Sequence, residues 1–259
     1  MLILAAGLAA LAVACADKTP TSSDQPSVVS TATGDSTATA SLSREQLEPL
    51  MVNAQLQPSD LPGTWKMTDR GMIRGDALAM SGGQQTQIGQ AVIDACLAPQ
   101  LEGGGDMRAD SGVIRAFVSD SILGSVISTV FRRGDGAART VAALRQPVTD
   151  EMTACVGAEV LKSFGSTPPG GSMNVGELRS VTDLPDGSAA NVVTMTLGSG
   201  GSAITQQIVT AGVARDRLFA TAVEVTISGG NAAPNPPLAP ERLVEVATKR
   251  LQEALAAPR

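Results

Sequence analysis

The residue types that could do chemistry are limited first by histidine, which the 259-residue chain lacks. Without imidazole there is no Ser-His-Asp or Cys-His nucleophile pair, no His-ligated zinc and no His-based pH switch. Carboxylates are then the candidates for acid/base catalysis. Six aspartates are candidates for this role: Asp60, Asp94, Asp106, Asp110, Asp120 and Asp135. Most of them stand beside Gly or Ser, where Asp commonly caps a turn, so we interpret them as structural and expect no enzyme.

Two Gly-rich segments could hold an ion or a phosphate. Residues 101–112 contain Asp106 and Asp110, but they lack the alternating Asp/Asn spacing and the closing Glu of an EF-hand calcium loop. The GSGGS segment at 198–202 stands between two expected strands rather than before a helix, which favours a hairpin turn over a phosphate cradle. We therefore expect neither a metal nor a cofactor.

Two further features could contact a ligand. Arg132, Arg133, Arg139 and Arg145 form a basic cluster that would suit an anionic ligand or lipid headgroup. A charged sheet edge in solvent is the commoner explanation of such a cluster. Trp65 is the only Trp in a chain with four Phe and no Tyr. It lies in the Pro/Gly-containing loop LQPSDLPGTWK, either as a lid over the core or as a ring that contacts a ligand in a cleft.

Composition excludes one large class of partner. The chain carries a net charge of −6, and its Phe and Trp residues are its only aromatic residues. A nucleic-acid-binding surface needs a basic patch, and commonly aromatic side chains on which bases stack. We therefore expect no nucleic-acid partner, and we expect a core built from Ala, Val, Leu, Ile and Met.

The beginning of the sequence has the features of an export signal. Residues 1–14 (MLILAAGLAALAVA) are uncharged and apolar, and they end in small residues directly before Cys15. Because no Lys or Arg precedes this run, we expect translation to start further upstream. A plain secretory signal or an uncleaved anchor would be alternatives, although 14 residues are too few to span about 30 Å of hydrocarbon.

The stretch LAVAC at 11–15 resembles the lipobox of bacterial lipoproteins, in which the signal is cut before a Cys that then carries lipid. The resemblance implies that Cys15 is the lipid attachment residue and that the protein lies on the extracytoplasmic face of the cell membrane. Residues 16–43 contain seven Ser and six Thr and no apolar periodicity, which is typical of a disordered stalk. We therefore divide the chain into a signal at 1–14, a lipidated Cys with its stalk at 15–43, and a single domain at 44–259.

If Cys15 carries lipid, the remaining cysteines are the pair Cys96 and Cys155. Each lies on the apolar stripe of an expected helix, within residues 84–97 and 150–164. A disulfide would join the two helices, and closing a loop of this length is worth roughly 4 kcal/mol in the chain-entropy model. Two buried free thiols are the alternative.

Periodicity and turn signals predict an α+β fold, with an antiparallel β-meander and helices packed on one face of the sheet. We expect strands at 112–119, 123–131, 173–182, 190–198, 202–212 and 217–228. We expect helices at 44–55, 137–146, 150–164 and 240–255, with Thr149 as the N-cap of the third.

The last expected strand alternates in character. Its large apolar residues share one face, namely Phe219, Val223, Val225 and Ile227. Glu224 and Thr226 share the other face, so the alternation predicts a sheet that is dry on one side and solvated on the other. Pro240 is expected to open the last helix, whose Leu243, Ala247, Leu251 and Leu255 recur every four residues. We expect this helix to lie across the dry face.

Residues 56–255 resemble the extracytoplasmic sensor-type domain of actinobacterial lipoproteins and of some actinobacterial Ser/Thr protein kinases. The resemblance rests on the LPGTW loop, the placement of Cys96 and Cys155 around the first strands, the strand ARDRLFATAVEVTIS and the closing helix ERLVEVATKRLQEAL. It implies a non-enzymatic domain that binds or senses a cell-envelope ligand or protein. A lipid or glycolipid carrier is the main alternative, and a His-independent hydrolase is a further one.

Overall fold

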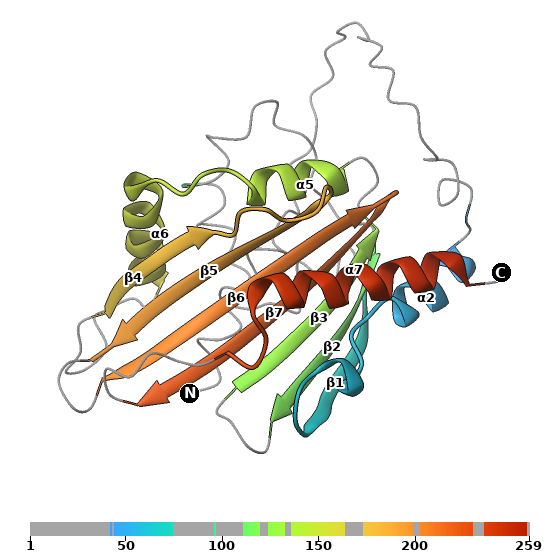
Figure 1. Cartoon of the computed structure of the whole chain (residues 1–259), viewed down its shortest axis with the longest axis horizontal. Helices are drawn as coiled ribbons and strands as arrows, with labels where there is room; N and C mark the ends of the chain where they lie inside the picture. The colour runs from blue at the N-terminus through green and yellow to red at the C-terminus, as the bar shows by residue number, and fades with distance from the viewer. Residues whose placement is uncertain are drawn as a thin grey trace, which may run out of the picture.

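A seven-stranded antiparallel sheet organises the chain (Figure 1). The computed structural model describes residues 42, 44–74, 96, 111–119, 124–132, 136–163, 173–198, 203–229 and 236–257. The strands are β1 (Trp65–Arg74), β2 (Ser111–Ser119), β3 (Gly124–Arg132), β4 (Met173–Ser180), β5 (Ser188–Leu197), β6 (Ile204–Arg215) and β7 (Leu218–Gly229). Their spatial order is β1-β2-β3-β7-β6-β5-β4, so a three-stranded and a four-stranded meander join where β3 pairs with β7. The α+β class and the antiparallel meander predicted from the sequence are confirmed.

Helices accompany the sheet near both ends of the chain and between its two meanders. They are α2 (Arg44–Asn53), the short 3-10 helix η2 (Pro58–Asp60), α5 (Gly136–Leu144), α6 (Asp150–Ser163) and α7 (Pro240–Ala256). Each predicted α-helix in the described residues is therefore present within a few residues of its expected bounds.

The helices pack on both faces of the sheet, which corrects the expectation of a single covered face. α7 lies across the front of the sheet in Figure 1, and its Leu243 belongs to the same buried cluster as Val209 of β6. α5 packs on the opposite face, where Val141 lies in a cluster with Phe219 of β7. Both sides of the central strands are thus covered, as in a three-layer arrangement.

The position of α7 also differs from the expectation. We predicted that it would cover the face that carries Phe219, whereas it covers the opposite face. The strands present small residues there, including Ala211, Ala220 and Ala222, and these lie in one cluster with α7. Small side chains let a helix approach a sheet closely, so the alanine-rich face suits a packed helix. The large apolar residues of β7 on which the prediction rested, such as Phe219 and Val223, lie on the face that α7 does not cover.

The face that carries Glu224 is not solvated. Glu224 is 1% exposed and Thr226 is 6% exposed, so the expected alternation of dry and solvated residues along β7 is absent. β7 is a central strand, with β3 on one side and β6 on the other. A central strand covered by helices on both faces buries both sets of side chains, whatever their polarity.

Residues 65–74 form an edge strand that the sequence did not predict. The sequence predicts an extended loop at residues 56–66 that presents Trp65. The structure instead starts β1 at Trp65 and pairs it with Ser119 of β2, with a bulge between Met67 and Asp69. A polar, Gly-containing segment can form a strand at an edge, because its neighbour supplies the hydrogen bonds.

Candidate functional site

A solvent-open groove of about 540 Å³ lies at the end of β4, and we call it the β4 groove. Its walls are residues 145–148, which connect α5 with α6, and residues 178–184, which end β4 and begin the connection to β5. Its apolar lining consists of Pro147, Val148, Leu178, Val181 and Leu184. Arg145, Arg179 and Asp183 add charged groups to the lining. Ser180 and Thr182 add hydroxyl groups, so the lining combines apolar side chains with an equal number of polar or charged ones.

Arg145 joins the two walls of the β4 groove. Its Nε donates a hydrogen bond to the carbonyl oxygen of Ser188 at 2.6 Å, and its Nη2 donates to that of Leu184 at 3.0 Å and to that of Pro185. Its Nη1 lies 3.7 Å from Oδ1 of Asp186. Because the guanidinium is bonded to main-chain carbonyls of the β4–β5 connection, we interpret Arg145 as a residue that positions this wall.

The β4–β5 connection has a restricted backbone. Gly187 has a φ of 73°, and a Cβ at this position would overlap the guanidinium of Arg215. Arg215 Nη1 donates to the carbonyl oxygen of Asp186 at 2.8 Å. Asp183 also has a positive φ, of 60°, which Asp tolerates better than most residues. The wall is therefore held by a glycine and by two arginines.

A second groove, of about 440 Å³, lies between α6 and β4, and we call it the α6 groove. The helix contributes small residues to it, namely Ala154, Gly157 and Ala158, and β4 contributes Asn174 and Val175. A Cβ on Gly157 would lie 3.4 Å from Cγ2 of Val175, so the helix and the strand are close at this point. The two grooves therefore lie on consecutive parts of β4.

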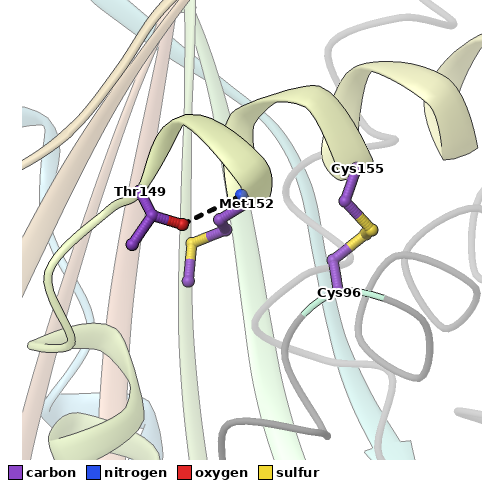
Figure 2. The surroundings of a disulfide bond; sticks show 4 residues. All are labelled: Cys96, Thr149, Met152 and Cys155. Atoms are coloured by element: carbon purple, nitrogen blue, oxygen red, sulfur yellow. Dashed lines mark hydrogen bonds between the residues drawn. A yellow bond between two sulfur atoms is a disulfide. The ribbon is translucent and has the colours of Figure 1, made fainter.

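The helix beside the second groove is fixed at two points (Figure 2). Thr149 Oγ1 accepts a hydrogen bond from the Met152 N–H at 3.1 Å, which confirms the predicted N-cap. Cys155, further along α6, forms a disulfide with Cys96, and this confirms the predicted pair. The helix expected around Cys96 lies outside the described residues apart from Cys96 itself. The cap and the disulfide together hold α6 in place.

Glu224 of β7 is a buried carboxylic acid away from both grooves. Burial raises the pKa of Glu224 to about 7, although hydrogen bonds from the Leu238 N–H and the Thr226 hydroxyl act in the opposite direction. The Thr226 hydroxyl lies 3.5 Å from Oε1, and Oε2 has no hydrogen-bond partner among the residues that the structure describes. Glu224 lines neither groove, so its unusual pKa belongs to the packed face beneath the segment that leads into α7.

Trp65, for which the sequence left a lid and a ligand contact as alternatives, lies in the core. Its side chain is in the α7-side cluster with 6% of its surface exposed, and its indole Nε1 donates to the carbonyl oxygen of Pro62 at 2.8 Å. Trp65 lines neither groove. This placement favours the lid alternative over a ring in a ligand cleft.

One of the aspartates considered for catalysis, Asp60, has a structural role. Both of its oxygens accept hydrogen bonds from Arg250 of α7 at 2.7 Å, and Oδ2 also accepts the Gln57 N–H at 2.8 Å. Asp60 thus caps η2 and attaches it to α7. The remaining candidates lie outside the described residues: Asp94, Asp106, Asp110, Asp120 and Asp135.

Several other predictions also concern residues outside the described ranges. These include Cys15, the signal, Arg133 and most of the GSGGS segment. The stalk also lies outside them apart from Leu42, which is partly buried against the α7-side cluster. The structure places Arg132 at the end of β3 and Arg139 within α5, but it describes neither side chain. Of the basic cluster, Arg145 alone can therefore be assigned a role.

Within the described residues, no group of three or more Cys, Asp or Glu is arranged to hold a metal ion. None of the described helices has both the length and the apolar character needed to cross a bilayer. Comparison with known proteins matched neither a family model nor a curated protein.

Sequence reasoning missed the grooves, because the walls of each come from segments that are separated along the chain and meet only in the fold. Of the residues in the β4 groove, it identified Arg145 alone, and for a different role. A weak signal was present in β4, whose MNVGELRS sequence interrupts apolar positions with Gly and charges. Such a pattern is typical of an edge strand.

Proposed function

We propose that the chain is a lipid-anchored, extracytoplasmic, non-enzymatic domain of the ligand-binding or sensor type, with the β4 groove as its ligand site. The β4 groove is the observation that carries the binding function. Its volume of about 540 Å³ falls within the range of small-molecule sites. Its apolar lining and charged groups suit an amphipathic ligand with an apolar part and a polar part.

The hydrogen bonds and the restricted backbone that hold the walls of the β4 groove favour binding to a preformed site. Arg145 bonds one wall to the other, and Gly187 with Arg215 sets the backbone of the β4–β5 connection. A site held in its binding conformation loses little entropy when a ligand enters. The Cys96–Cys155 disulfide supports the extracytoplasmic location, because such bonds persist in oxidising compartments.

The open form of the groove favours sensing or capture over lipid carriage. A carrier of lipid chains needs an enclosed apolar cavity, whereas the β4 groove and the α6 groove both open to solvent. Lipid or glycolipid carriage remains the alternative from a different class.

A groove-filling variant tests this proposal with the dye 8-anilinonaphthalene sulfonate, which has an apolar body and one anionic group. Val148 is half-buried in the lining, so Val148→Trp fills the β4 groove. Arg242→Trp is the matched control, because Arg242 is exposed on α7. We expect the native full chain to enhance the emission of the dye, Val148→Trp to weaken dye affinity at least about tenfold, and Arg242→Trp to leave it unchanged.

Unfolding curves of both variants confirm that each chain is folded before binding is compared. Muramyl dipeptide and dihexanoyl phosphatidylglycerol then serve as competitors from two envelope classes. Equal dye binding by the native chain and Val148→Trp, or no dye binding by the native chain, would exclude the β4 groove as the ligand site.

A further inference from the structure

β4 ends the described sheet on one side, and its outer edge presents main-chain hydrogen-bonding groups. The Val181 N–H donates to the Ala190 carbonyl oxygen at 2.8 Å, so residue 181 bonds toward β5. In an antiparallel ladder, the side of the strand toward which the N–H and C=O groups point alternates from residue to residue. Leu178 and Ser180 consequently direct their N–H and C=O groups away from β5, toward the outside of the sheet.

Two opposite charges flank Leu178 on this edge. Glu177 and Arg179 lie two residues apart and so on the same face of β4, and Arg179 Nε lies 3.2 Å from Glu177 Oε1. Both side chains are about half exposed, at 56% and 47% respectively. The pair is therefore accessible to a molecule that approaches the edge.

This spacing makes the edge complementary to itself. If a second β4 strand pairs antiparallel with Leu178 opposite Leu178, then Glu177 of each copy stands opposite Arg179 of the other. Leu178 would form a hydrogen-bonded pair with its own copy, because its main-chain groups point outward. The charged pairs would occupy the neighbouring non-hydrogen-bonded positions, where cross-strand side chains are closest.

We propose that the β4 edge is a homodimerisation surface, through which two copies of this chain pair across a two-fold axis at Leu178 and continue the sheet. A two-fold axis requires a surface that is complementary to itself, and the Glu177/Arg179 arrangement has this property. Charges on an edge usually discourage pairing. Here they discourage pairing in other registers, since a shift by two residues would place like charges opposite each other.

The interface consists of a short strand segment, so the dimer is of the weak and transient class. The added strand would lie next to the residues of β4 that line the two grooves, so a second copy would extend the walls of both. Dimerisation would in this way couple the two ligand sites of the proposed function, although the pairing itself does not depend on that function.

Charge reversal tests the proposal by sedimentation equilibrium of the full chain in a density-matched detergent. The native chain is expected to show a concentration-dependent monomer–dimer equilibrium. Arg179→Glu places glutamates opposite glutamates, and Glu177→Arg places arginines opposite arginines. Each should weaken dimerisation roughly tenfold or more, because two attractive pairs become repulsive.

Mixing the two variants supplies the decisive comparison. An equimolar mixture of Arg179→Glu and Glu177→Arg should form a heterodimer, because every cross-strand pair is again of opposite charge. The double variant, Glu177→Arg with Arg179→Glu, should form homodimers as the native chain does. This rescue separates pairing from damage to the fold, since a misfolded variant would not be rescued by its complement.

Cysteine cross-linking reports the register in membranes that hold the full chain. Leu178→Cys should form an intermolecular disulfide, because residues opposite each other in a hydrogen-bonded pair have Cα atoms about 5.5 Å apart. Ser180→Cys is the matched control, since the two copies of residue 180 would lie about 13 Å apart along the strands. A native chain that is monomeric at all concentrations, a mixture that does not associate, or equal cross-linking of both variants would overturn the proposal. Binding of a synthetic extended peptide to a chain that stays monomeric would also overturn it, by assigning the edge to another partner.

Discussion

Glu224 is the residue whose acid–base chemistry the fold changes most clearly. Burial raises its pKa from 4.5 to about 7, so the folded chain retains a proton that the unfolded chain loses at lower pH. Below the unfolded value both states are protonated, and the contribution of Glu224 to stability is complete. As the pH rises toward 7, the free energy of unfolding falls progressively, by about 3 kcal/mol in total.

Glu224→Gln should remove this pH dependence, because glutamine resembles the protonated acid and does not ionise. We expect the free energy of unfolding of the native chain, relative to Glu224→Gln, to fall between about pH 4.5 and pH 7 and to level off above that range. Denaturant unfolding of both proteins at several pH values measures the difference, from which the other carboxylates largely cancel. Parallel curves over this range would show that Glu224 does not titrate with a raised pKa.

Trp65 provides a direct optical report on the core. Its ring is buried and its N–H is bonded to the Pro62 carbonyl, so native emission should be blue-shifted and should move to longer wavelength on unfolding. Because it lines neither groove, its emission should not change when muramyl dipeptide or dihexanoyl phosphatidylglycerol binds. Native emission like that of free tryptophan in water, or a large change on binding, would be incompatible with the lid assignment.

At the scale of elements, the Cys96–Cys155 disulfide has the largest expected single effect on stability. It closes a separation of 59 residues and joins α6 covalently to residue 96. Replacing both cysteines with serine should lower the free energy of unfolding by roughly 4 kcal/mol in the chain-entropy model, of which native-state strain can remove part.

Denaturant unfolding of the oxidised native chain and the Cys96→Ser/Cys155→Ser double variant measures this effect. The double variant is also its own redox control, because a reductant should destabilise the native chain and leave the variant unchanged. Equal stability of the two proteins, or free thiols in exported native protein, would argue against a structural disulfide.

The sequence predicted those elements whose own residues carry the signal. Pro240 and the four-residue spacing of Leu243, Ala247 and Leu251 predicted α7, and Thr149 predicted the start of α6. β1 was missed because its pairing with β2, rather than its own polar composition, makes it a strand. A strand held by its neighbour leaves little trace in local periodicity.

The faces of the sheet and the β4 groove depend on contacts between distant segments. Glu224 indicates a solvated face when β7 is considered alone. It is buried because β3 and β6 flank β7 and because the segment that leads into α7 lies over it. Val148 and Leu178 line one groove because the sheet brings β4 beside the α5–α6 connection. Neither relation follows from spacing along the chain.

At the scale of the whole molecule, we propose a chain of three parts: a lipidated Cys15, a Ser/Thr-rich stalk and a folded domain with a preformed groove. A flexible stalk of this length has a root-mean-square reach of about 30 Å, which would hold the domain clear of a membrane surface. Attachment to a membrane would also raise the local concentration of the chain, so a weak β4 dimer could form there at low total abundance.

Membrane attachment through Cys15 is the central claim, and fractionation of a bacterial host that produces the full chain tests it most directly. The native chain should partition with membranes, incorporate labelled fatty acid and be degraded by protease added outside the inner membrane. Cys15→Ala should lose the label and fail to mature normally, whereas Ser22→Ala, a stalk control, should behave as the native chain does. Recovery of the native chain and Cys15→Ala in equal amounts in the soluble secreted fraction, both without fatty-acid label, would contradict the account.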